Sequence, residues 1–255
     1  MIAVEFSLRV SSMYSIRVPY SYQCARTYPL PAPSTIKGLC ANALWRRYGG
    51  DPVEHLKDIH HRAIGATVRS DYPIAVSACT VRVIPKNALI RQFVFTPSIA
   101  CMIVFEEDSG ELPDKVTEAL GGAPVYLGDS ESLVTCSPPY LSSDIERVTI
   151  GEAVEVNCLS PFNLINQKSI ETTPDSRGVV LYMQEDPISD NAVLERYLAP
   201  LRQEGDTYYP LDRFSFKASN NCFLIRGKRL TGVFHRTGPA VTPDKAKQRR
   251  KVKSA

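Results

Sequence analysis

The sequence lacks the features that would assign it to several common functional classes. No apolar run approaches the roughly 20 residues that a membrane-spanning helix needs. The N-terminus shows no basic segment followed by an apolar core, so we expect no secretory leader, no membrane partner and a cytoplasmic location. The seven cysteines include no Cys-x-x-Cys pair, which favours buried reduced thiols over a zinc site or a disulfide framework.

Catalytic signatures are also scarce. The HExxH, GxSxG and Walker A motifs and a cluster of metal-binding carboxylates are all absent, as is the aromatic RNP1 motif of RNA-recognition strands. We therefore expect no metal, no cofactor and no enzyme activity.

Charge is present, but its distribution matters more than its total. The net charge of +3 divides into +7 over residues 1–91, −15 over residues 92–212 and +11 over residues 213–255. A polyanion would be attracted to both end segments and repelled by the middle one. The acidic middle segment would face solvent or a basic protein partner.

The first 137 residues alternate between strand and helix patterns. Residues 2–10 alternate apolar and polar side chains, as in a half-buried strand. An amphipathic helix follows, with Ser34 as a candidate cap and Gly49-Gly50 at its end. The remaining elements are a β-hairpin over 72–95, a buried strand over 99–105, a short helix that begins at Pro113 and a strand over 133–136. The order β-α-β-β-α-β predicts an α+β fold with a ferredoxin-like, RRM-type domain over residues 1–137.

The rest of the chain predicts two further parts. Residues 138–238 contain several strand-like runs and one helical pattern near Val193–Leu198, so we expect a smaller, mostly β module. Residues 239–255 are basic and almost without apolar side chains, which predicts a disordered tail.

The start of the main helix is the first candidate RNA-binding site. Free backbone N–H groups at a helix N-terminus, the hydroxyls of Ser34 and Thr35 and the ammonium of Lys37 together suit a phosphate. An ordinary capped helix with a solvated lysine explains the same residues. Arg17, Arg26 and Tyr28 precede the helix, and interleaved arginine and aromatic side chains suit single-stranded bases and phosphates.

The predicted hairpin is the second candidate site. It carries Arg82, Lys86 and Arg91, and Arg69 precedes it. It would clamp RNA or form a plain solvated ribbon. On the helix, Asn42 and Trp45 share a face with small residues, which fits a partner interface, although packing of Trp45 inside this chain is an equal alternative.

A catalytic alternative rests on Tyr48, His60 and His61. A metal-independent ribonuclease needs a base, an acid and a cation around one phosphate, and these residue types occur together here. Surface histidines are the plainer interpretation, because neighbours such as His60 and His61 point apart in regular structure.

Several segments resemble the CRISPR-associated Cas-five family of the RAMP superfamily. The segment YPLPAPSTIKGLCANAL over 28–44 follows RVPYSYQ over 17–23 and is similar to the N-terminal signature of that family. The strand region 91–105 and the sequence YLGDSES over 126–132, similar to the family's glycine-containing loop, support the resemblance. The variant at 17–22 looks most like type I-A members. Beyond residue 137 no family pattern is visible.

The resemblance implies a non-catalytic subunit of a type I Cascade complex in antiviral defence. Such a subunit binds and caps the 5′ handle of the crRNA, contacts the backbone and large subunits, and meets target DNA through the complex. The hairpin at 72–95 would be its thumb, and Ser34, Thr35, Lys37 and Arg26 would lie near handle phosphates. Type I-C relatives cut precursor crRNA themselves, so a metal-independent endoribonuclease is the alternative function.

Overall fold

The computed structural model describes residues 1–21, 24–84, 87–122, 124–128, 132–169, 178–188 and 193–235, and of Cys24 and residues 81–89 it describes the backbone alone. The predictions for Lys86, the side chain of Arg82 and the tail at 239–255 therefore lie outside the described part. Within it, helices and antiparallel strands are mixed, so the α+β class is confirmed. No described helix is long and apolar enough to cross a membrane.

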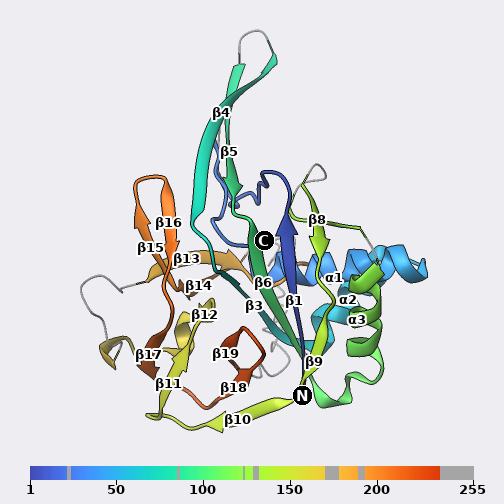
Figure 1. Cartoon of the computed structure of the whole chain (residues 1–255), viewed down its shortest axis with the longest axis vertical. Coiled ribbons are helices and arrows are strands. Elements are labelled where there is room, and N and C mark those ends of the chain that lie inside the picture. Colours follow the sequence, from blue (N-terminus) through green and yellow to red (C-terminus); the bar gives the residue numbers. More distant parts are fainter. Residues whose placement is uncertain are drawn as a thin grey trace, which may run out of the picture.

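A central antiparallel sheet organises the N-terminal half (Figure 1). Its strand order is β3-β6-β1-β8-β7, and β9 also pairs with β1. The strands span Ile2–Val10 (β1), Ala63–Ser70 (β3), Ser98–Phe105 (β6), Val125–Tyr126 (β7), Leu133–Cys136 (β8) and Tyr140–Ser142 (β9). The predicted strands at 2–10, 99–105 and 133–136 are thus present.

Three helices cover one face of this sheet: α1 (Pro33–Tyr48), α2 (Pro52–Arg62) and α3 (Leu112–Gly122). Val4 and Phe6 of β1 share one buried cluster with Ile36 of α1 and Leu120 of α3. Helix α1 begins after Ala32 with Pro33 in its first turn and has no side-chain cap. The prediction of a Ser34 cap is wrong, because proline already supplies a helical φ and needs no N–H partner at that position.

Helix α2 was not predicted. Asp51 accepts a hydrogen bond from the Val53 N–H at 2.8 Å and caps it, and Pro52 occupies its first turn. The helix-start signals, Asp51 and Pro52, were visible in the sequence. However, the segment is mostly polar and only Ile59 is fully buried, so its apolar periodicity is weak.

The opposite face of the central sheet is covered by strands from the C-terminal half of the chain. Ala3 of β1 and Met102 of β6 belong to a buried cluster with Ile225 and Phe234. The covering strands are β10 (Asp144–Val148), β18 (Cys222–Arg226) and β19 (Thr231–Phe234), paired in the order β10-β18-β19.

The rest of the C-terminal half is also mostly β. It adds a pair, β11 (Ala153–Val156) with β17 (Phe214–Lys217), and a sheet of β12 (Ser160–Pro161), β14 (Leu194–Ala199) and β13 (Val179–Gln184). Short 3₁₀ helices lie at Glu107–Ser109, Phe162–Leu164 and Gln167–Ser169. The predicted helix near Val193–Leu198 is wrong, because this segment is β14, whose backbone pairs with strands on both sides.

A long ribbon projects from the body at the top of Figure 1. It consists of β4 (Ile74–Ile84) and β5 (Asn87–Phe95), which pair antiparallel as the predicted hairpin requires. The ribbon belongs to a five-stranded sheet of order β15-β16-β4-β5-β2. The added strands are β2 (Cys24–Ala25), β15 (Leu201–Glu204) and β16 (Thr207–Pro210).

Candidate nucleic-acid interface

A groove of about 920 Å³ lies where α1, the segment before β2, the ribbon strand β5 and the end of β7 meet. We call it the arginine groove. Its lining includes Ser15, Arg17, Ala25, Thr35, Gly38, Asn42, Arg46, Arg91, Tyr126 and Gly128.

Helix α1 supplies one wall of the groove. Thr35, Gly38, Asn42 and Arg46 follow one another at intervals of three and four residues, so they form one stripe along the helix. The Arg46 Nε donates a hydrogen bond to the Asn42 Oδ1 at 2.9 Å. The Arg46 guanidinium also lies 5.0 Å from the centre of the Tyr126 ring, within cation–π range.

A glycine closes one end of the groove. Gly128 has a φ of +84°, and a methyl group at this position would overlap the carbonyl oxygen of Ser15 and lie 2.8 Å from Cγ1 of Ile16. Only glycine tolerates both the left-handed backbone and this close approach. The loop after β7 can therefore lie directly against residues 15 and 16.

The groove is positively charged. Arg17, Arg46 and Arg91 line it, and the described residues of its lining include no acidic side chain. Thr35 and Asn42 add neutral hydrogen-bonding groups. Three guanidinium groups around a concave surface favour a polyanion, and Tyr126 adds an aromatic ring at the same place.

Four of the residues singled out from the sequence meet in this groove: Arg17, Thr35, Asn42 and Arg91. Asn42 was expected at a protein interface, and here it holds Arg46 in place. Arg46 was not predicted as a site residue, although it lies four residues after Asn42 and therefore on the same face of the helix. Tyr126 was missed as a site residue because only the tertiary fold brings it to α1.

Other predicted RNA-binding residues lie elsewhere. Ser34 is half-buried and does not line the groove. Tyr28 is buried, its hydroxyl donates to the carbonyl of Tyr182, and burial raises its pKa to about 12. Arg26 is exposed and close enough to Tyr208 to oppose the rise in pKa that burial causes in that phenol.

Lys37 lies inside the protein. Its side chain is 2% exposed, and its Nζ lies 2.9 Å from the Glu185 carboxylate. The other oxygen of that carboxylate accepts a hydrogen bond from the Tyr197 hydroxyl. Lys37 therefore joins α1 to the loop after β13 and does not present its charge on the surface that Arg17 and Arg46 share.

Arg69 is also engaged within the chain. Its guanidinium lies 3.0 Å from the Asp71 carboxylate and 4.0 Å from that of Asp212. Two carboxylates offset its charge, so Arg69 adds little to the field of the ribbon.

The face of the central sheet that RRM domains use for RNA is closed. Glu5, at the centre of that face, is buried and accepts a hydrogen bond from the Arg229 N–H at 2.9 Å. The Arg229 guanidinium binds the Ser7 hydroxyl and the Asp71 carboxylate. The turn between β18 and β19 thus sits on the sheet, and RNA has no access to it.

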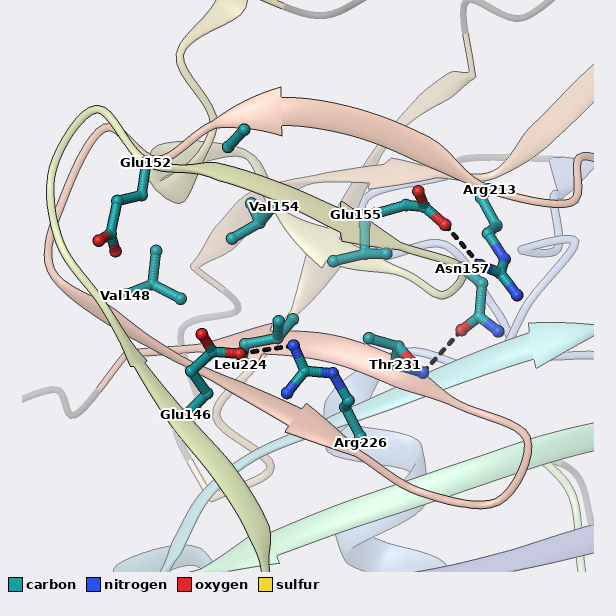
Figure 2. Close-up of a pocket in the computed structure, with 12 residues that line it drawn as sticks. Glu146, Val148, Glu152, Val154, Glu155, Asn157, Arg213, Leu224, Arg226 and Thr231 are labelled. Atoms are coloured by element: carbon teal, nitrogen blue, oxygen red, sulfur yellow. Dashed lines mark hydrogen bonds and ion pairs between the residues drawn. The ribbon is translucent and has the colours of Figure 1, made fainter.

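A second groove, of about 720 Å³, lies between β10, β18 and β11 (Figure 2). Its charged side chains pair with each other: Arg213 with Glu155 at 2.6 Å, and Arg226 with Glu146. Glu152 accepts from a backbone N–H. Because the carboxylates offset both arginines, this groove does not favour an anion.

The residues of the catalytic alternative are not brought together around one point. The Tyr48 hydroxyl donates to Glu118 at 2.6 Å, and this bond raises its pKa. His60 lies near Lys37. Lys37 and Tyr48 are 11 residues apart on α1, which corresponds to ~16 Å along the helix axis, so His60 and Tyr48 are near opposite ends of that helix. His61 is exposed, with its ring centre 5.8 Å from that of His60. The described residues also contain no group of three His, Cys, Asp or Glu suited to a metal ion.

His60 predicts a pH dependence of stability. Burial, followed by the nearby Lys37 ammonium, lowers its pKa below the ordinary value, although Asp186 at 3.4 Å opposes this. The neutral imidazole is therefore the form that the fold favours, and stability should fall as the pH drops below about 6.5, the pKa in the unfolded chain. We expect urea unfolding between about pH 7.5 and pH 5.5 to show a smaller loss for His60→Gln than for the unchanged protein. His61→Gln, at an exposed position, is the matched control, and an equal loss in all three proteins would contradict the assignment.

Comparison with known proteins supports the family resemblance. Residues 6–92 match the model of the family described as CRISPR-associated protein (Cas_Cas5). No curated protein sequence matches the chain. A solved structure described as "Crystal structure of a CRISPR protein from Archaeoglobus fulgidus" is 13% identical, with a TM-score of 0.62 over 93% of this chain and 100% of that one, and it shows the same fold. A structure described as "CRISPR RNA-guided surveillance complex" is 17% identical, with a TM-score of 0.44 over 81% of this chain and 91% of that one. Over residues 6–92, the chain is therefore similar to the CRISPR-associated Cas5 family.

Proposed function

We propose that this protein is a non-catalytic, RNA-binding subunit of a type I CRISPR surveillance complex and holds the 5′ handle of the crRNA in the arginine groove. It contacts the backbone and large subunits of that complex in the cytoplasm and meets target DNA through them. Its sequence variant at 17–22 favours subtype I-A. This role serves antiviral defence.

The arginine groove is the observation that carries the proposal. Arg17, Arg46 and Arg91 converge from three separate segments on one concave surface that also contains Tyr126. All three arginines lie within residues 6–92, the part of the chain that matches the Cas_Cas5 family. Arginine planes and aromatic rings recognise splayed single-stranded bases and their phosphates, which fits a single-stranded RNA end.

The strand order supports a RAMP-type, ferredoxin-like domain. Strands β1, β3, β6 and β8 lie in the order β3-β6-β1-β8, and α1 and α3 follow the first and third of these strands in the chain. This is the arrangement expected of a split β-α-β fold. The ribbon of β4 and β5 is inserted between β3 and β6, where it would serve as the thumb.

Trp45 favours a protein partner beside the groove. Its side chain is 39% exposed, and the Arg46 guanidinium lies 5.8 Å from its ring. A large exposed aromatic residue next to an arginine is typical of interaction hot spots. We assign Trp45 to the contact with a neighbouring subunit of the complex.

One assay distinguishes the non-catalytic RNA-binding subunit from the alternative, a metal-independent endoribonuclease. Purified protein is incubated with CRISPR repeat RNA in EDTA, and we expect the RNA to remain intact but bound, with an affinity that falls steeply as salt is raised. A single clean cleavage that is lost in His60→Ala or His61→Ala but kept in Lys115→Ala, at an exposed lysine outside this segment, would establish the enzyme instead. Binding that is insensitive to salt would count against the arginine groove.

A further inference from the structure

One face of the five-stranded sheet that includes the projecting ribbon carries aromatic side chains that are exposed or half-buried. Directly opposed residues of antiparallel strands share a face. Phe95 lies opposite Ala75, and Ala75 in turn lies opposite Thr207 of β16. Phe93 and Phe95 of β5 therefore point to the same side of the sheet as Tyr209, and Phe95 and Tyr209 are 46% and 36% exposed. We call these three rings the aromatic face.

The opposite face of the same sheet is occupied by the core. Ile74 and Val94 of the ribbon and Leu201 of β15 are buried. They alternate with the residues of the aromatic face along each strand, as the pleat requires. The aromatic rings are therefore held on the outer side by a register that cannot slip without exposing the core.

Arginines accompany these rings. The Arg91 guanidinium lies 5.0 Å from the centre of the Phe93 ring, and the Arg202 guanidinium lies 5.8 Å from that of Tyr209. Arg202 also pairs with Glu204 at 2.9 Å. Accessible aromatic rings next to guanidinium groups are the elements with which proteins stack single-stranded bases without reading their sequence.

Arg91 connects the aromatic face to the arginine groove. It lines the groove and also lies against Phe93 on the ribbon. Phe93 and Phe95 continue the same side of β5 at steps of ~6.8 Å. A strand of RNA that leaves the groove past Arg91 would meet these two rings in succession.

We propose that the aromatic face is a stacking platform that binds the bases of single-stranded RNA where the strand leaves the arginine groove. This inference rests on the proposed function, because it assigns a second contact to the same RNA. The groove binds phosphates, and the aromatic face binds bases. Its contribution should therefore depend on the bases and change little with salt.

The test compares two fluorescently labelled probes of equal length, a single-stranded oligoadenylate and the same ribose-phosphate backbone without bases. We expect the double variant Phe95→Ala and Tyr209→Ala to weaken binding of the oligoadenylate about tenfold, within the range for loss of one stacked base, and to leave binding of the abasic probe unchanged. Ile90→Ala is the matched control, since Ile90 is 44% exposed on the same strand but points to the other side. Phe95→Leu combined with Tyr209→Ala keeps apolar area at position 95 without a ring and should behave like the double alanine variant.

The outcomes separate this inference from the proposed function. If replacing the groove arginines weakens both probes but the aromatic double variant binds like the unchanged protein, the platform is wrong and the groove stands. If the double variant weakens both probes equally, the face does not act by stacking. If the unchanged protein binds neither probe, the platform is wrong and a protein partner becomes the occupant of the face, while binding of repeat RNA separately decides the proposed function.

Discussion

Replacing Arg17, Arg46 and Arg91 together with alanine should weaken binding of single-stranded repeat RNA about 100-fold at moderate salt. Each guanidinium that contacts a phosphate releases a counterion from the RNA, and about 1 kcal/mol for each of three contacts gives a change of this size. The slope of log affinity against log salt should fall by about 2, since each contact to a single strand contributes about 0.7. Fluorescence anisotropy at several salt concentrations measures both quantities.

A matched control removes equal charge elsewhere. Arg147, Arg213 and Arg226 are exposed arginines of the C-terminal half, and Arg213 and Arg226 are paired with glutamates. Their triple replacement with alanine should change RNA affinity less than threefold. If both triple variants lose affinity equally, the RNA responds to overall charge and the groove is not its site.

Gly227→Ala should lower the free energy of unfolding by about 3 kcal/mol, through overpacking and disruption of a buried carboxylate. A methyl group on Gly227 would overlap the Oε2 atom of Glu5 and lie 2.8 Å from Cε of Met102. Glu5 is buried in the centre of the sheet, so it has little room to move, and its bond from the Arg229 N–H would break. Urea denaturation at neutral pH measures the loss.

Gly122→Ala supplies the comparison for this prediction. Gly122 ends α3, and a methyl group there meets no atom within 4 Å. This variant should unfold within about 0.5 kcal/mol of the unchanged protein, as surface substitutions usually do. Equal stability of the Gly227 and Gly122 variants would mean that the turn after β18 does not rest on Glu5 as described.

The sequence was sufficient for the elements whose pattern is local. The alternation over 2–10, the apolar period between Ile36 and Leu44 and the hairpin of β4 and β5 each follow from spacing within one segment. Sequence-based prediction failed where the local pattern is weak or fits both a helix and a strand. The polar helix α2 was missed. The segment near Val193–Leu198 resembled a helix, but pairing with strands on both sides makes Leu194–Ala199 the strand β14.

The sequence by itself determined the family resemblance and the fact that arginine and aromatic residues crowd the segments around α1. Only the tertiary structure decided which of them can meet RNA. Lys37 and Tyr28 are buried and not available to RNA. Lys37 forms an ion pair with Glu185, and the Tyr28 hydroxyl donates a hydrogen bond to the Tyr182 carbonyl. Contacts between distant segments brought Arg46 and Tyr126 to Arg17 and Arg91. Whether a charged side chain can contact a ligand depends on these tertiary contacts, which join distant segments. The local sequence pattern of one segment does not specify them.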